Sequence, residues 1–146
     1  MDERIRDGIY RAVKQEPLAQ TLGMRLVDLS PGFSAVEMDH RSELMNNIFG
    51  RAHGGAIFSL IDEAFETVCQ TSGIITVALN VSVSYLASPE NGSRLRAEAR
   101  EINLSRKTAT YNITVSSQDG TLIASAQALA YRTGKPLPFL ETTAEG

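Results

Sequence analysis

One long helical pattern, followed only by alternating strand patterns, constrains the fold of this chain most. From residue 56 to about residue 71, apolar residues recur at the i, i+3, i+4, i+7 spacing of a buried helix. The positions that follow this spacing are Ile57, Leu60, Ile61, Ala64, Phe65 and Val68. Because they cover much of the helix circumference, we expect a sheet on one side of the helix and a second copy of the chain on another.

Alternation with a period of two predicts four strands after this helix. The first, over residues 75–85, alternates six apolar residues with small or polar ones. The others are expected at residues 95–104, 109–115 and 122–132, and a change of parity near Arg100 and Glu101 predicts a bulge. Asp119-Gly120 is typical of a hairpin turn between the last two strands.

The residues before this helix predict two short helical segments and a hairpin. Apolar residues recur every fourth position from Ile5 to Val13, after an N-cap at Asp2, and residues 18–23 form a brief helical piece. Residues 24–29 and 33–39 fit two strands joined by a turn. The whole pattern predicts an α+β fold, an antiparallel sheet wrapped around a long helix. We expect a single domain over residues 1–133 and an irregular tail over residues 134–146.

Composition excludes several classes of partner. The 14 basic and 17 acidic residues give a net charge of −3, which favours neither nucleic acid nor an anionic membrane. The lone Cys69 and the absence of an apolar N-terminal run predict a cytoplasmic protein without disulfides. Two histidines and one cysteine show no ligand spacing, so no metal is expected.

Residues 47–66 have the layout of an active site. A polar loop leads through Gly54 and Gly55 into the apolar helix, which carries carboxylates. The N-terminus of a helix offers unpaired N–H groups with partial positive charge, and these can hold an oxyanion. Asp62 lies among apolar neighbours, where partial dehydration raises the pKa of a carboxyl group. We therefore expect an oxyanion donor and a base to face one substrate.

Asn47, His53-Gly54-Gly55 and Asp62 together resemble the signature of hotdog-fold acyl-CoA thioesterases, in particular the phenylacetyl-CoA thioesterase branch. The resemblance covers roughly residues 17–133. It implies hydrolysis of an acyl-CoA thioester, with an aryl-acetyl or medium-chain acyl group, to the free acid and CoA. It also implies a homodimer with active sites shared between subunits, often paired into a tetramer, and no cofactor beyond the CoA of the substrate.

The resemblance also implies a role for each matching residue. Gly54 offers its backbone N–H to the thioester carbonyl, and Asn47 helps to polarise the same carbonyl. Asp62 acts either as a general base on water or as a nucleophile, and both routes stay open. Some relatives orient the water with a hydroxyl on the next strand, and here Thr76 or Asn80 could serve, since the alternation places both on one face.

Further residues are expected to support this site. His53 should order the loop before the helix rather than transfer a proton, and Gly55 should permit close packing. Glu66 lies four residues after Asp62 on the same helical face, where its charge would raise the pKa of Asp62 further. The candidates for contacting the phosphates of CoA are Arg51, Arg106 and Lys107.

A second class of function stays open at this point. A noncatalytic acyl-CoA-binding or regulatory protein could keep the same fold without turnover. The joint presence of Asn47, Gly54 and Asp62 favours the enzyme. Retained binding of CoA thioesters without turnover would favour the binding protein.

Overall fold

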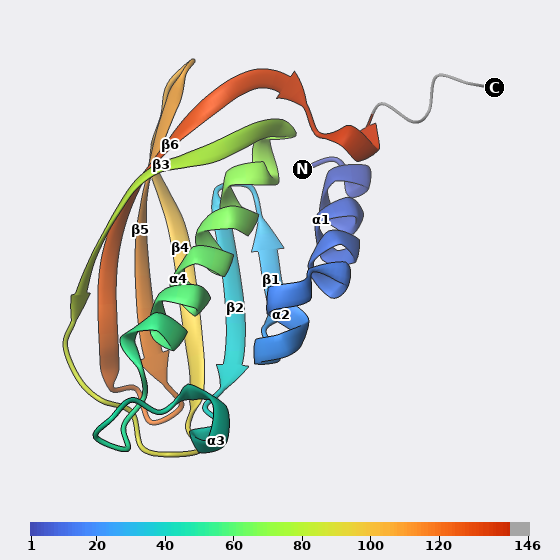
Figure 1. The fold of residues 1–146 in the computed structure, drawn as a ribbon. Coiled ribbons are helices and arrows are strands. Elements are labelled where there is room, and N and C mark those ends of the chain that lie inside the picture. The colour runs from blue at the N-terminus through green and yellow to red at the C-terminus, as the bar shows by residue number, and fades with distance from the viewer. Residues whose placement is uncertain (141–146) are drawn as a thin grey trace.

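The computed structural model describes residues 1–140 and shows an antiparallel sheet curved around one long helix (Figure 1). The helices are α1 (Glu3–Gln15), α2 (Pro17–Leu22), α3 (Ser42–Met45) and α4 (Gly54–Cys69). The strands are β1 (Arg25–Ser30), β2 (Phe33–Asp39), β3 (Ile74–Tyr85), β4 (Arg94–Leu104), β5 (Thr108–Ser117) and β6 (Leu122–Pro136). Two short 3-10 turns, η1 (Gln70–Ser72) and η2 (Pro138–Leu140), complete the described elements.

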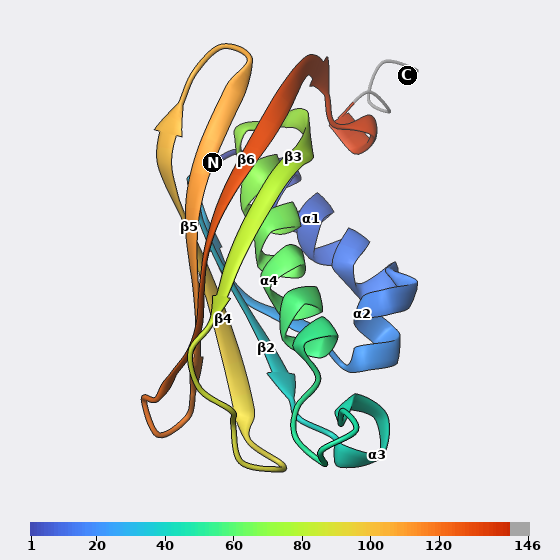
Figure 2. The same cartoon turned by 60° about the vertical axis from the view of Figure 1, so that its left-hand side comes forward.

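The sheet order is β1-β2-β4-β5-β6-β3, and every neighbouring pair is antiparallel. β3 follows α4 in the chain but pairs only with β6, so it forms one edge of the sheet. Figure 2 shows three layers: the sheet, then α4, then α1 and α2 on the side of α4 away from the sheet. The predicted α+β architecture, a sheet wrapped around a long helix, is confirmed.

The apolar side chains of α4 hold this helix against the sheet. All six positions that define the predicted helix are buried. The Phe65 ring meets Tyr111 of β5 edge to face, with ring centroids 5.6 Å apart. Small residues on β6 leave room for the helix: Ala124, Ala126, Ala128 and Ala130 are all at most 5% exposed. Burying a large apolar side chain contributes roughly 1.5–3 kcal/mol, so this interface supplies much of the stability of the fold.

The N-terminal elements agree with their sequence signals. The Asp2 side chain caps α1 by accepting from the Arg4 N–H at 2.8 Å. Gly23 ends α2 with φ at 68°, a left-handed conformation that glycine adopts without strain. β1 and β2 form the predicted hairpin. Within residues 1–140, none of the helices has the length and apolar content that crossing a bilayer requires.

Three details differ from the expected boundaries. The bulge in β4 lies between Glu101 and Asn103, just after the predicted position. The pairing of β3 with β6 is irregular between Ile74 and Thr76 and again between Ala78 and Asn80, which the alternation did not predict. β6 continues to Pro136, which pairs with Ile74, so the prediction of an irregular tail from residue 134 is wrong at residues 134–136. After Leu137, the described part of the predicted tail is the turn η2, Pro138–Leu140, and residues 141–146 lie outside the described residues.

Candidate active site

The start of α4 carries one free backbone donor. His53 is the N-cap, and its Nδ1 accepts a hydrogen bond from the Gly55 N–H at 2.8 Å. A Cβ on Gly55 would lie only 3.0 Å from this Nδ1, so a side chain there would crowd the cap. The Gly54 N–H has no acceptor among residues 1–140 and lies at the positive end of the helix dipole. The two glycines therefore have different local environments.

Asn47 adds a second donor beside Gly54. Its Oδ1 accepts from the N–H groups of Phe49 and Arg51, at 2.9 and 3.1 Å, which fixes the side chain in the loop. This leaves the Nδ2 amide without an acceptor among the described residues. Asn47, Arg51 and Gly54 line one cavity of about 390 Å³. Tyr85 also lines it, and its hydroxyl donates to the Gly54 carbonyl at 3.2 Å. We call Asn47 and Gly54 the loop half-site.

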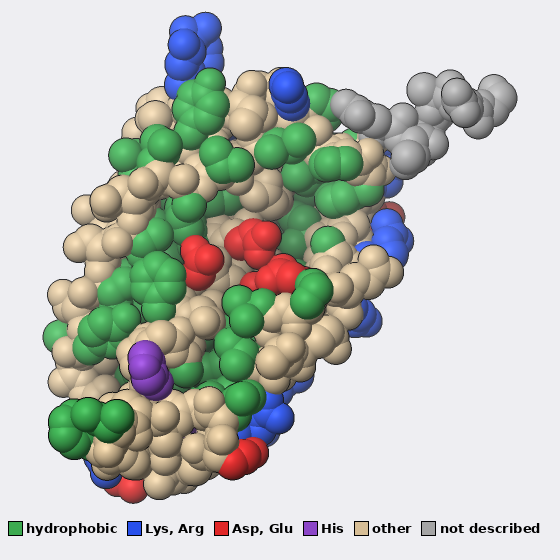
Figure 3. Space-filling model, in the orientation of Figure 1, with side chains coloured by type: hydrophobic (Ala, Val, Ile, Leu, Met, Phe, Trp, Pro, Cys, Tyr) green, Lys and Arg blue, Asp and Glu red, His purple; other side chains and the backbone are tan. Residues whose placement is uncertain are grey.

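Asp62 faces a different cavity further along α4. This second cavity, also about 390 Å³, is lined by Asp62, Glu66 and Thr76 among others, and we call these three residues the helix half-site. Partial burial is the main cause that raises the pKa of Asp62, and repulsion from Glu16 is the second. The predicted direction is therefore confirmed, but the added charge comes from Glu16, at the junction of α1 and α2, rather than from Glu66. Figure 3 shows acidic side chains at the centre of this face of the molecule, with apolar side chains around them.

The two half-sites do not meet within one chain. Asp62 lies eight residues after Gly54 on one continuous helix, and a rise of 1.5 Å per residue separates them by about 12 Å. A general base must come within about 3 Å of the proton it takes, directly or through one water. A single chain therefore presents the donors and the carboxylate at separate places.

The bulge in β3 separates the two candidates for orienting water. Thr76 is 5% exposed and lines the helix half-site, and its backbone N–H donates to Gln70 Oε1 at 3.2 Å. Asn80 pairs with Leu129 on the outer face of the sheet, because the bulge shifts the register after Ala78. The prediction that Thr76 and Asn80 share a face is wrong, and Asn80 is not among the residues that line either cavity.

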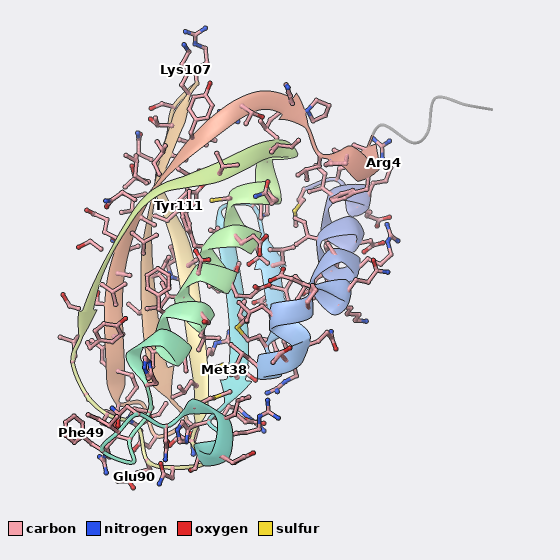
Figure 4. All side chains as sticks on the ribbon, in the orientation of Figure 1. Arg4, Met38, Phe49, Glu90, Lys107 and Tyr111 are labelled. Carbon is pink, nitrogen blue, oxygen red and sulfur yellow. The ribbon has the colours of Figure 1, made fainter. Side chains whose placement is uncertain are left out.

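The three candidate cations lie at two different places in the molecule. Arg51 lies beside the loop half-site, where its Nε donates to Ser88 Oγ at 3.1 Å. Arg106 and Lys107 lie in the turn between β4 and β5. Figure 4 shows Lys107 at the opposite end of the molecule from Phe49, which belongs to the cavity of the loop half-site. Of these three candidates, Arg51 is the one that lines the cavity of the loop half-site in the described chain.

Sequence reasoning placed Glu63 near Asp62 but did not predict its burial, and it missed Glu16. Glu63 is 3% exposed, and its carboxyl lies with those of Glu16 and Glu66 in one group whose oxygens are within 4.8 Å of one another. Glu63 follows Leu60 by three residues, so its place on the apolar face was a signal available in the sequence. No pattern in the sequence brings Glu16 to α4, because that contact is tertiary.

Comparison with known proteins identifies the class to which this site belongs. Residues 49–124 match the family model of the Thioesterase superfamily, and the chain belongs to that family. Acyl-coenzyme A thioesterase PaaI of Escherichia coli is 25% identical over 134 residues, 92% of this chain and 95% of that protein. The structure of E. coli PaaI, from the phenylacetic acid degradation operon, superimposes with a TM-score of 0.87 over 92% of this chain and 96% of that one.

Two further structures support the same grouping. A mutant of the phenylacetic acid degradation protein PaaI from Thermus thermophilus is 36% identical, with a TM-score of 0.76, over 80% of this chain and 99% of that one. A Streptococcus mutans protein solved with bound acetyl-CoA is 30% identical, with a TM-score of 0.73, over 78% of this chain and 91% of that one. The predicted hotdog fold and the predicted resemblance to the phenylacetyl-CoA thioesterase branch are confirmed.

Proposed function

We propose that this protein hydrolyses acyl-CoA thioesters to the free acid and CoA. Membership of the Thioesterase superfamily and the named activity of E. coli PaaI support this proposal. The acetyl-CoA bound to the S. mutans relative supports a CoA thioester as the ligand. The observation that carries the proposal is the pair of free donors at the start of α4, the Gly54 N–H and the Asn47 amide, in one cavity.

The loop half-site polarises the thioester carbonyl. When water attacks the carbonyl carbon, negative charge develops on the carbonyl oxygen, and fixed donors stabilise this charge without reorganisation. Gly54 donates from the positive end of the helix, and Asn47 donates from a side chain whose oxygen is already held by the loop. Loss of one such donor typically lowers the rate about 100-fold to 1000-fold.

Asp62 either activates the water that attacks the carbonyl carbon or attacks this carbon itself. As a general base it takes a proton from water while the water oxygen bonds to the carbonyl carbon, and the tetrahedral intermediate then expels the CoA thiolate. As a nucleophile its carboxylate oxygen bonds to the carbonyl carbon and the C–S bond breaks, which releases the CoA thiolate and leaves a mixed anhydride that water hydrolyses to the free acid and the Asp62 carboxylate. The raised pKa of Asp62 suits both routes, because it makes the carboxylate more basic. Thr76, buried in the same half-site, is the residue we assign to orienting the water.

A homodimer completes the site. β3 is an edge strand with unpaired backbone groups, and its side chains Val77 and Leu79 are 47% and 57% exposed. If two copies pair β3 with β3 in antiparallel fashion, their α4 helices also run antiparallel. The loop half-site of one chain then faces the helix half-site of the other. As the family resemblance implies, two such dimers pair into a tetramer.

In this proposal the acyl group of the substrate binds in one cavity and the CoA group binds beside the other. The acyl group, aryl-acetyl or medium-chain, enters the helix half-site, whose walls include Phe65 and Val77. Arg51, at the loop half-site, is placed to contact a phosphate of CoA. Arg106 and Lys107 lie in the turn between β4 and β5, and Lys107 is at the opposite end of the molecule from Phe49. They would therefore reach the same CoA only from the second copy.

The test is release of free thiol from a panel of acyl-CoA substrates. Phenylacetyl-CoA and medium-chain acyl-CoAs should release CoA, detected with a thiol reagent, and the kcat/KM values would rank the acyl preference. If no substrate in the panel releases thiol while a nonhydrolysable CoA thioether still binds, the protein binds acyl-CoA without catalysis and the proposal fails.

A further inference from the structure

A buried histidine outside the proposed mechanism connects the sheet to the loop half-site. His40 directly follows β2 and is 3% exposed. Its two ring nitrogens bind two separate loops: Nε2 lies 2.8 Å from Asn46 Oδ1, and Nδ1 accepts from the Gly92 N–H at 3.1 Å. Figure 1 shows β2 ending beside α3, after which the chain enters the loop that carries Asn47. His40 therefore lies between the end of a strand and the start of this loop.

The two partners of His40 determine which ring nitrogen carries the proton. The Gly92 N–H can only donate, so Nδ1 carries no proton. The Asn46 side-chain oxygen can only accept, so Nε2 carries the proton and donates it to Asn46. Both nitrogens of the neutral ring are thus satisfied, as is usual for a buried polar group. The backbone N–H of His40 also donates to the Ser93 carbonyl at 2.8 Å, which fixes the residue itself.

Asn46 lies at the base of the loop half-site. It ends α3 and pairs with Ala52 in an isolated antiparallel bridge, so the loop begins and closes at this pair. Inside the bridge, the Asn47 N–H donates to the Arg51 carbonyl at 2.7 Å, and Asn47 Oδ1 accepts from the Arg51 N–H at 3.1 Å. These bonds hold the loop together but do not attach it to the sheet. The Asn46 side chain attaches it to the end of β2 through His40.

We propose that His40 is a positioning residue, which holds the Asn47 amide where it donates to the thioester carbonyl. The inference rests on the proposed thioesterase activity and adds to its site a residue that contacts no substrate. A donor stabilises the developing oxyanion only within about 2.7–3.1 Å of it, and a misplacement of about 1 Å can cost roughly 100-fold in rate. Loss of the bond between His40 and Asn46 frees the base of the loop, so the donor loses its fixed position.

Two substitutions separate the two hydrogen bonds of His40. His40→Gln keeps an N–H near the place of Nε2, for Asn46, and gives up the acceptor for Gly92. His40→Asn keeps an oxygen near the place of Nδ1, for Gly92, and gives up the donor for Asn46. Because only the bond to Asn46 leads to Asn47, His40→Asn should lower kcat for phenylacetyl-CoA about tenfold or more with little change in KM. His40→Gln should keep kcat within about threefold of the wild-type value.

A double-mutant cycle with Asn47→Ala tests whether His40 acts through Asn47. Once the donor is removed, its position no longer matters, so adding His40→Asn to Asn47→Ala should lower kcat by less than about twofold. A role in stability alone would lower the melting temperature in both backgrounds and leave kcat unchanged. Asn46→Ala removes the same hydrogen bond from the other side, so it provides the same test if His40→Asn does not fold.

The matched control is Thr71→Val. Thr71 is 7% exposed, and its hydroxyl also accepts from a glycine N–H, that of Gly32, at 3.1 Å. It lies just after the C-terminal end of α4, whereas Gly54 begins this helix. The control therefore removes a comparable buried acceptor away from the loop half-site, and it should lose stability while it keeps the wild-type kcat.

Three results would overturn the inference while the wild type is active. They are a wild-type kcat in folded His40→Asn, equal losses of kcat in His40→Asn and His40→Gln, and an undiminished further loss when His40→Asn is added to Asn47→Ala. Absence of turnover by the wild type would instead refute the proposed activity, and this inference with it.

Discussion

Mixing two inactive variants should restore activity if, as we propose, the donors and the base of each site come from different chains. Asn47→Ala removes a donor and should leave about 1% of the wild-type rate or less, and Asp62→Asn should leave about the same. Gly54 and Asp62 lie about 12 Å apart on one helix, and the proposed site therefore combines Asn47 and Gly54 of one copy with Asp62 of another.

The size of the recovery follows from this arrangement. Random mixing of equal amounts makes about half of the dimers mixed, and each mixed dimer has one of its two sites intact. The expected activity is therefore about one quarter of the wild-type value, roughly 25-fold above either variant alone. The two variants are unfolded together, refolded and assayed by thiol release, and native mass spectrometry confirms that mixed dimers form.

A pair of variants in one half-site provides the control. Asp62→Asn mixed with Asp62→Ala damages every site, so this mixture should stay inactive. If mixed dimers of the Asn47 and Asp62 variants form but recover no activity, each site lies within one chain and the division into two half-sites is wrong.

Three further predictions concern the fold around the site. His53→Ala removes the acceptor for the Gly55 N–H, so it should lower the free energy of unfolding, measured by urea titration, by about 1 kcal/mol. An unchanged free energy of unfolding would show that the cap is not formed. Leu60→Ala, at a fully buried position, should lower the free energy of unfolding by about 2–5 kcal/mol. Leu44→Ala, at a position 48% exposed, should lower it by well under 1 kcal/mol, and equal losses for the two variants would contradict the assigned core. Burial raises the pKa of Cys69 to about 12, so a thiol reagent should label it at mildly alkaline pH only after unfolding, and rapid labelling of the native protein would refute this burial.

The elements predicted best are those whose local pattern coincides with their tertiary environment. α4 has apolar residues at helical spacing, and each of them is buried, so the pattern and the packing carry the same information. The β1–β2 hairpin and the stop of α2 at Gly23 follow from turn residues alone. These features need no knowledge of what lies next to them in space.

The placement of Asn80 could not be predicted, because it depends on strand pairing. Residues 75–85 alternate without interruption, which predicts a regular strand. Pairing with β6 inserts a bulge between Ala78 and Asn80, and a shift of one residue sends every later side chain to the other face. The partner strand, rather than β3 itself, decides which face Asn80 takes.

The carboxylate cluster could be predicted only in part, for a related reason. Glu63 occupies the apolar face of a predicted helix, so its burial was foreseeable. Glu16 reaches it from 47 positions earlier in the chain, and only the packing of the α1–α2 junction against α4 brings the two together. The separation of Gly54 from Asp62 was also available from helix geometry alone, since it requires only the rise per residue.

The most direct test of the proposed thioesterase is the kcat for phenylacetyl-CoA hydrolysis, compared between the wild type and Asp62→Asn. We expect the wild type to turn over, and the variant to lose about 100-fold to 10,000-fold in kcat with its oligomeric state unchanged. A variant that keeps the wild-type kcat would contradict the assignment of Asp62 as the base or nucleophile of this site.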